Sequence, residues 1–160
     1  MDAIEKLVAI EDIRQLKSSY FRALDTRDWV LLREIFSESP EADYRGAVDE
    51  DPEAGGATVA NAVNSQVLTT RDMVVDGLRD ALAGSKSLHL GVNPEITFLP
   101  DGTAKGVWAM EDWLWLEGTS PKTRLRGHGH YHNTFTKEGG SWRIKKLRLT
   151  RVNVQVSHYD

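Results

Sequence analysis

Three residues of this 160-residue chain could together move a proton on a small molecule: His89, Asp112 and Tyr20. His89 and Asp112 lie in strand-like runs of the C-terminal half, and Tyr20 lies on the apolar stripe of the first helical segment. A histidine, an aspartate and a tyrosine that converge in an apolar cavity can remove a proton, return it and hold a developing oxyanion. This chemistry needs no metal and no organic cofactor, so we expect neither.

The spacing of His89 and Asp112 predicts that they form a dyad. Pairing about the turn at 101–102 places His89 diagonally across from Asp112, within reach of its side chain. If Asp112 accepts a hydrogen bond from one ring nitrogen, it fixes the tautomer and leaves the other nitrogen as a base. Alternation separates Asp112 from Glu111, but both faces of this run are apolar, so which acid lies inside stays open. A core histidine and a carboxylate at a bulge or subunit interface are the structural alternatives.

Further polar and aromatic residues are candidates for positioning a substrate. Asp25 follows Tyr20 by five residues, and it could orient a partner or cap the turn at 26–28. Arg151 lies among Leu149, Val152 and Val154 of the last strand, which favours an inward position. The full set of predicted substrate-binding residues is Asp25, Asn93, Trp108, Met110, Tyr131, Asn133 and Arg151.

The run Gly127–His132 suggests a metal site because it contains three histidines. On a strand these histidines share one face and span about 13 Å, from a rise of roughly 3.3 Å per residue. Three collinear ligands do not converge on one tetrahedral ion. We therefore predict that His128, His130 and His132 face solvent or an interface, with Tyr131 and Asn133 turned toward the cavity.

The elements that must position these residues change in type along the chain. The apolar spacing predicts a helix, or a kinked pair, over 3–26, with Asp2 and Glu5 as a capping box. Asp28 is placed to cap a second helix, and Thr69 to cap a third helix at about 70–83. In the third helix Val74, Leu78 and Leu82 are expected to face inward. The first helix has one apolar set near its start, and a second continues at helical spacing: Ile4, Leu7 and Val8, then Ile13, Leu16, Tyr20 and Leu24.

From Leu88 on, the apolar period changes to two. Four strands are expected at about 87–98, 103–117, 123–137 and 141–156, with turn residues between them. A short strand is expected at Ala42–Arg45, and a long acidic loop at about 46–66. Helices followed by an antiparallel meander indicate the α+β class, and strands of this length must twist and coil around the helices.

Composition limits the function classes. The length suits a single domain over residues 1–160, and the net charge of −4 offers no footprint for nucleic acid or an anionic membrane. The chain has no cysteine, which excludes disulfides and thiol nucleophiles. The N-terminus does not read as a signal peptide and no stretch is long enough to span a membrane, so we expect a cytoplasmic protein.

Four stretches resemble the SnoaL-like branch of the nuclear-transport-factor-2-like superfamily: Ile13–Asp28, Leu88–Ile96, Arg126–Asn133 and Ser141–Arg151. The resemblance implies a cone, in which a curved sheet wraps around helices and encloses a deep apolar pocket. Members include polyketide cyclases, ketosteroid isomerases, scytalone dehydratase, bile-acid dehydratase and the small subunits of ring-hydroxylating dioxygenases.

The dehydratases are the most similar in site pattern. Their helix-one tyrosine looks like Tyr20, and their base histidine looks like His89. In the bile-acid enzyme the acidic partner matches Asp112, an aspartate matches Asp25, and a late arginine is similar to Arg151. Asn133 aligns near an asparagine of scytalone dehydratase, which has a second histidine at the position of Asp112. The loop at 46–66 does not align.

The expected function is therefore that of a small-molecule lyase or isomerase, dehydratase-like, acting on a hydrophobic oxygenated ring compound such as a steroid or polyketide. Three alternatives stay open: a cyclase-like enzyme that uses Asp112 alone, a non-catalytic ligand-binding protein, and a structural subunit of a ring-hydroxylating dioxygenase. Trp113 and Trp115, or their neighbours, predict an apolar outer face. With the family's habit of dimers and trimers, this implies a homo-oligomer.

Overall fold

The computed structural model describes residues 1–46 and 66–160, and the loop expected at 46–66 therefore lies almost wholly outside the described residues. Helices and one strand come first, and four long antiparallel strands follow, as the α+β prediction requires. The elements in chain order are α1 (Ala3–Thr26), α2 (Trp29–Ile35), β1 (Phe36–Gly46), α4 (Arg71–Ala81), β2 (Ser85–Phe98), β3 (Ala104–Leu116), β4 (Lys122–Glu138) and β5 (Ser141–Tyr159).

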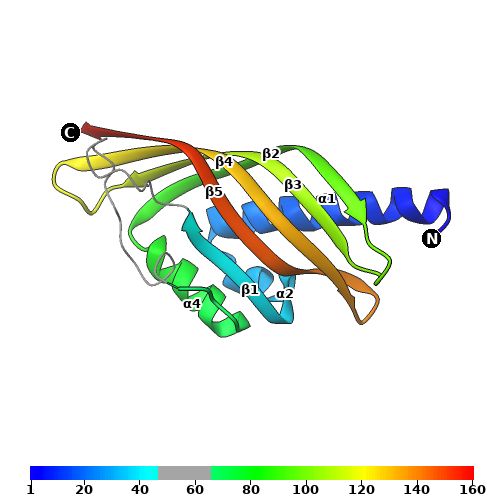
Figure 1. Cartoon of the computed structure of the whole chain (residues 1–160). Coiled ribbons are helices and arrows are strands. Elements are labelled where there is room, and N and C mark those ends of the chain that lie inside the picture. Colours follow the sequence, from blue (N-terminus) through cyan, green and yellow to red (C-terminus); the bar gives the residue numbers. More distant parts are fainter. Residues whose placement is uncertain (47–65) are drawn as a thin grey trace.

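The five strands form one sheet in the order β1-β5-β4-β3-β2. β1 runs parallel to β5, and every other neighbouring pair is antiparallel. The sheet arches over α1, and α2 and α4 lie beside β1 below the arch (Figure 1). Long, twisted strands curl in this way because the right-handed twist accumulates along each strand. The predicted cone, with a strongly curved and mainly antiparallel sheet, is confirmed.

α1 is one continuous helix, not a kinked pair. The predicted capping box is present, since Asp2 accepts from the Glu5 amide while Glu5 accepts from the Asp2 amide. The N-terminal end of α1 extends past the sheet (Figure 1). The apolar set at this end is therefore not buried: Ile4, Leu7 and Val8 are 74%, 66% and 55% exposed, because no strand covers them.

The shorter helices begin close to where the sequence placed them. Asp28 caps α2 by accepting from the Leu31 amide at 3.0 Å. The cap of α4 is Thr70, not the predicted Thr69. The hydroxyl of Thr70 accepts from the Met73 amide at 3.1 Å, and its extended backbone leads into a helix that starts one residue later than expected.

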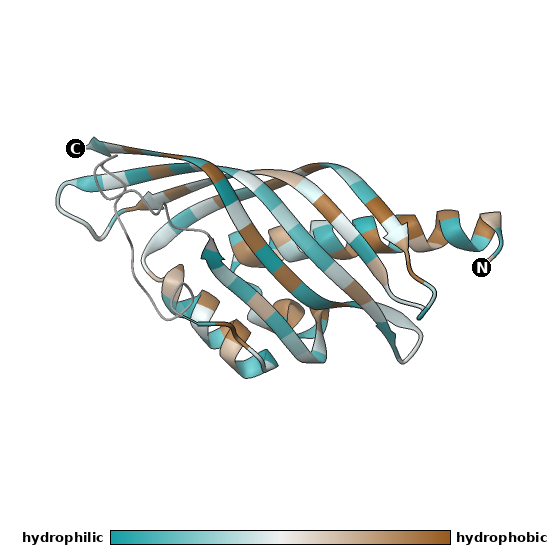
Figure 2. Ribbon diagram, in the orientation of Figure 1, coloured by the Kyte–Doolittle hydropathy of each residue, from teal (hydrophilic) through white to brown (hydrophobic). Residues whose placement is uncertain are grey.

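The two faces of the sheet differ in polarity, which appears as alternating hydrophobic and hydrophilic bands along the strands (Figure 2). On β3 the inner face carries Trp108, Met110 and Asp112, all buried, whereas Glu111 lies on the outer face. Asp112 is therefore the acid that lies inside, a choice that the alternation of the sequence left open. The inner face packs on α1, α2 and α4, and this core contains Tyr20, Tyr44 and Tyr131.

Bulges in the strands decide where several polar residues point. β5 carries one extra residue relative to β4 at Val152, which is 74% exposed while Arg151 stays on the inner side. β2 carries a bulge between Val92 and Glu95, where Asn93 adopts a φ of 50°. A bulge bends its strand and re-aims the side chains beside it. Within the part of the chain that the structure describes, no helix is both long and apolar enough to cross a membrane.

Candidate functional site

The carboxylate of Asp25, at the C-terminal end of α1, orients His89 on β2. Nδ1–H of His89 donates to Oδ1 of Asp25 at 2.6 Å, and the backbone amide of His89 donates to Oδ2 at 2.9 Å. Both residues sit away from solvent, with side chains 7% and 19% exposed. Because Nδ1 carries the proton that Asp25 accepts, Nε2 holds the free lone pair and can act as a base.

The hydrogen bonds around Asp25 continue into the turn that follows α1. Ser87, on the same face of β2 as His89, donates its hydroxyl to Asp25 at 2.9 Å. Arg27, the left-handed residue that ends α1, donates to the Ser87 hydroxyl at 2.8 Å and to the Ser85 carbonyl at 2.7 Å. The end of α1 is thereby tied to β2, and Asp25 accepts three hydrogen bonds that hold its carboxylate in place.

The predicted pairing of His89 with Asp112 is wrong, although the two residues are directly opposite each other in the β2–β3 register. Asp112 pairs with Arg151 instead: Nη1 donates to Oδ1 at 2.6 Å and Nη2 to Oδ2 at 2.5 Å. The pair is 2% and 7% exposed. A guanidinium satisfies both carboxylate oxygens at once, which an imidazole cannot do. Asp25, at the end of α1, is the partner of His89 in place of the predicted Asp112.

Two glycines of β4 make room for the Asp112–Arg151 pair. A Cβ atom on Gly127 would lie 1.3 Å from Nη1 of Arg151 and 2.5 Å from Oδ1 of Asp112. A Cβ atom on Gly129 would lie 1.9 Å from the carbonyl oxygen of Thr150, where β5 bulges. Gly127 and Gly129 are therefore required by close approach, a role that sequence reasoning did not assign to them.

A cluster of three tyrosine side chains, Tyr20, Tyr44 and Tyr131, fills the centre of the concave side. The hydroxyls of Tyr20 and Tyr44 share a hydrogen bond of 3.0 Å, and the rings of Tyr20 and Tyr131 pack edge to face. Burial raises the pKa of all three hydroxyls, reinforced for Tyr20 by its tyrosine neighbours and for Tyr131 by the Asp112 carboxylate. These phenols stay protonated at any ordinary pH, so they are hydrogen-bond donors.

Lys17 of α1 is fully buried among aromatic rings. Its Nζ lies 3.8 Å from the ring centroid of Tyr131, 4.3 Å from that of Tyr20, 5.0 Å from that of Phe21 and 5.9 Å from that of Trp108. Within residues 1–46 and 66–160 its amine has no hydrogen-bond partner. Burial lowers the pKa of Lys17 well below its usual range, because the charged form loses its hydration.

The predicted substrate-binding residues separate into two groups. Trp108, Met110, Tyr131 and Asn133 are buried on the inner face. Asn133 donates its amide to the Lys146 carbonyl at 3.3 Å, and its Oδ1 has no partner among the described residues. Asn93 is exposed at the β2 bulge and does not reach this group, because the bulge breaks the alternation that would have placed it beside His89.

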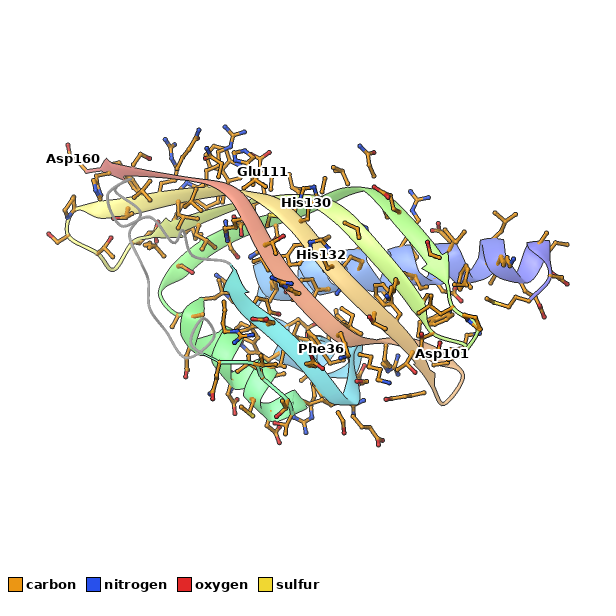
Figure 3. The ribbon with its side chains drawn as sticks, in the orientation of Figure 1. Phe36, Asp101, Glu111, His130, His132 and Asp160 are labelled. Atoms are coloured by element: carbon orange, nitrogen blue, oxygen red, sulfur yellow. The ribbon has the colours of Figure 1, made fainter. Side chains whose placement is uncertain are left out.

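The three histidines of β4 lie on the outer face, as expected. Figure 3 shows Glu111 and His130 on the side of the sheet away from the helices. His130 and His132 are exposed, and Nε2 of His128 lies 4.0 Å from the Glu111 carboxylate. Among the described residues, no group of three or more His, Cys, Asp or Glu side chains is arranged to hold a metal ion.

Sequence reasoning missed two residues of the site. Lys17 follows Ile13 by four residues and precedes Tyr20 by three, so helical spacing was sufficient to predict that it lies on the buried stripe. Leu16 was chosen for that stripe instead, and it lies at the edge of the core. Tyr44 fell within the expected strand Ala42–Arg45, but only the pairing of β1 with β5 brings it to the concave side.

A SnoaL-like domain is matched over residues 5–148, nearly the whole chain. The chain belongs to the SnoaL-like family. The matched stretch includes Lys17, Tyr20, Asp25, His89 and Asp112, and it ends just before Arg151.

Solved structures with low sequence identity share the fold of this family member. A scytalone dehydratase-like protein from Novosphingobium aromaticivorans DSM 12444 is 20% identical with a TM-score of 0.73, and the match covers 97% of this chain and 91% of that one. Hexachlorocyclohexane dehydrochlorinase LinA-type3 from Novosphingobium barchaimii LL02 is 15% identical, with a TM-score of 0.77 and 99% coverage of both chains. ActVI-ORFA from Streptomyces coelicolor is 11% identical, with a TM-score of 0.63 and coverage of 90% and 97%. These similarities establish the nuclear-transport-factor-2-like fold.

Proposed function

We propose that this SnoaL-like protein is a cofactor-independent lyase or isomerase that acts on a hydrophobic, oxygenated ring compound. The observation that carries the proposal is His89 held by Asp25 and directly opposite Asp112, the carboxylate that acts on the buried hydroxyl of Tyr131. A base and a set of phenolic donors on one concave, apolar surface suit proton removal beside a carbonyl. The reaction class is elimination of water, or a related proton shift.

In this scheme Nε2 of His89 removes the proton from the carbon beside the carbonyl. The electron pair of the broken C–H bond moves toward the carbonyl oxygen, and a tyrosine hydroxyl donates to the enolate that forms. The enolate then expels a hydroxyl group from the next carbon, and the imidazolium of His89 returns its proton so that water leaves. Asp25 stabilises that imidazolium through Nδ1.

The Asp112–Arg151 pair has a different role in the proposal. Both oxygens of Asp112 accept from Arg151, so this carboxylate is poorly placed to move a proton by itself. This geometry counts against the cyclase-like alternative in which Asp112 alone is the acid–base group. We propose that the pair has a structural role and stabilises the packing next to Tyr131. The charge of Asp112 adds to burial in raising the pKa of the Tyr131 hydroxyl.

The structural neighbours support elimination as the reaction class. A dehydratase-like protein and a dehydrochlorinase both share this fold over nearly all of the chain. Their names describe loss of water and loss of hydrogen chloride, and each reaction requires a base that removes a proton beside a leaving group. His89 is the residue of this chain that is best placed to supply that base.

The test begins with a panel of ring ketones that carry a hydroxyl group β to the carbonyl, assayed for the ultraviolet absorbance of the enone product. General acid–base catalysis is worth about 10²–10⁴-fold, so His89→Ala should lower kcat by at least about two decades. Loss of one oxyanion donor costs about 10²–10³-fold, which bounds the effect of Tyr20→Phe. His130→Ala is the matched control, because His130 lies on the outer face of the sheet.

Other outcomes identify the other function classes. Turnover that survives His89→Ala and disappears in Asp112→Asn would support the cyclase-like mechanism. Tight binding of ring compounds without turnover, unchanged in His89→Ala, would indicate a ligand-binding protein. Co-purification with a large oxygenase chain would indicate a structural subunit.

We further propose that the protein self-associates through an outer apolar patch, which comprises Leu88, Leu90, Val92, Trp113 and Trp115. Leu88, Leu90 and Val92 are 42%, 43% and 52% exposed on β2. Leu88 pairs directly with Trp113, which stacks on Trp115. Aromatic and aliphatic groups that gather on one exposed face favour burial against another protein, and a second copy presents the same face.

A further inference from the structure

We propose that the ε-amine of Lys17 is a nucleophile, which forms an imine with the carbonyl group of an aldehyde or ketone bound on the concave side of the sheet. Lys17 has no part in the reaction proposed above. The two proposals share only the site and the class of carbonyl ring compound, and each can fail without the other.

The first support is the position of the amine. Lys17 shares the buried stripe of α1 with Ile13, Tyr20 and Leu24, at the centre of the core and not at its rim. Its Nζ lies against the rings of Tyr20 and Tyr131, whose hydroxyls belong to the tyrosine cluster. The amine therefore lies against the two rings whose hydroxyls would hold a carbonyl oxygen.

The second support is the balance of charge and solvation. A buried ammonium loses several kcal/mol of hydration even after relaxation, and no described carboxylate or carbonyl lies within hydrogen-bond distance to compensate it. Ring faces return about 2 kcal/mol to a desolvated cation. A neutral amine loses far less hydration, and it can direct its N–H groups at the ring faces. The uncharged form is the nucleophilic one, which exposed lysines populate only rarely at neutral pH.

The covalent step balances without an oxidant or a reductant. The lone pair of Nζ attacks the carbonyl carbon, and the C=O π electrons move to the oxygen, which accepts a hydrogen bond from a tyrosine hydroxyl. One proton moves from Nζ to that oxygen to give a carbinolamine. The second N–H proton and the hydroxyl group then leave as water, and a C=N bond remains. Water removed in this way stays in equilibrium with solvent, so the capture is reversible.

The test uses benzaldehyde, an uncharged single-ring aldehyde, with sodium cyanoborohydride to fix any imine as a stable benzylamine. The folded full-length protein is labelled at pH 7, and peptide mapping by mass spectrometry locates the label. At this pH fewer than about one in 10³ exposed lysines is unprotonated, since their pKa is near 10.4. Lys17 should therefore be labelled at least about tenfold faster than Lys6, the exposed lysine of the same helix.

The pH dependence gives a second readout that mere accessibility would not produce. From pH 7 to 9 the labelling of Lys6 should rise about tenfold per unit, and that of Lys17 should change much less. In urea the two residues should react alike, because unfolding removes the aromatic surroundings of Lys17. Lys17→Met should lose the fast label and Lys6→Met should keep it.

The proposal is overturned if folded protein is labelled at Lys6 and other exposed lysines while Lys17 stays unmodified. It is also overturned if Lys17 reacts only in urea. Both results come from the wild-type chain, so they remain decisive even if Lys17→Met does not fold. Neither readout depends on turnover, so a negative result leaves the proposed reaction of His89 standing.

Discussion

Neighbouring acids on β3 form the same kind of ion pair under opposite physical conditions. Asp112 on the inner face binds Arg151, with side chains 2% and 7% exposed. Glu111 on the outer face binds Arg126 at 2.6 Å, with side chains 29% and 38% exposed. Burial raises the cost of separating the inner pair, whereas water and salt can replace either partner of the outer one.

The surroundings of the two pairs differ as much as their exposure. Gly127 leaves space for the inner guanidinium, and β5 bulges next to it. The outer carboxylate also accepts from the Trp113 indole at 2.8 Å, and its arginine lies over the same ring. The outer pair lies on the surface of the sheet, while the inner pair packs between β3, β4 and β5. Burial and packing, and not the residue types, decide how much each pair matters.

The most direct way to sharpen this comparison is to remove one charge from each pair. Asp112→Asn leaves Arg151 as a buried cation without a counter-charge, which should cost about 3–5 kcal/mol of folding free energy. Glu111→Gln should shift the urea midpoint far less, because Arg126 stays hydrated. The double variant Asp112→Leu with Arg151→Met should recover much of the loss. Equal midpoint shifts in the two single variants would contradict the distinction.

A second prediction tests the space that the inner pair requires. Gly127→Ala places a methyl group where Arg151 and Asp112 meet, and overpacking of this kind costs about 1–3 kcal/mol. Gly118→Ala is the control, because a Cβ atom there meets nothing within 4 Å. Urea unfolding monitored by circular dichroism gives both values. A Gly127→Ala protein as stable as Gly118→Ala would mean that the pair adapts at no cost.

The third prediction concerns Lys17, the buried amine on the concave side that has no counter-charge among the described residues. Its pKa is lowered in the folded protein and near 10.4 in the unfolded chain, so between these values the unfolded state binds one more proton. Wild-type stability should therefore rise with pH by about 1.4 kcal/mol per unit across that window, and fall as the pH drops through it. Lys17→Met should be more stable than wild type at neutral pH and should lack this slope.

The matched variant for that measurement is Lys6→Met, which removes an exposed lysine from the same helix. It should leave the dependence of unfolding free energy on pH unchanged. Parallel curves for Lys17→Met and wild type would show that the amine is protonated in the folded state as it is in the unfolded one.

The last and smallest effect is expected on the outer face. Leu90→Asp introduces a charge into the outer apolar patch, and it should weaken self-association by at least about tenfold, or about 1.4 kcal/mol, with little change in the monomer's fold. Val30→Asp on α2 is the control, since Val30 is 74% exposed and lies away from the patch. Sedimentation velocity over a concentration series measures both. A wild-type monomer at every concentration would remove the proposed interface.

The sequence predicted the class and order of elements well, because periodicity reports local backbone structure. The four long strands, the capping box at Asp2 and the cap at Asp28 all follow from side chains that interact with neighbours in sequence. The inward turn of Arg151 was also predictable, because apolar residues surround it on its strand. The predicted cap of α4 was wrong by one residue, because Thr69 and Thr70 are adjacent and either side chain could cap a helix.

The partners of the polar residues are a different matter. The sequence supplied His89, Asp25, Asp112 and Arg151 but paired them wrongly, since the choice between two carboxylates depends on where α1 ends relative to β2. The bulge in β2, which shifts one strand against the next, placed Asn93 outside. Local spacing determined which residues face the core. Only the tertiary structure decided which of them touch, because contacts between distant segments depend on register, curvature and the space that glycines leave.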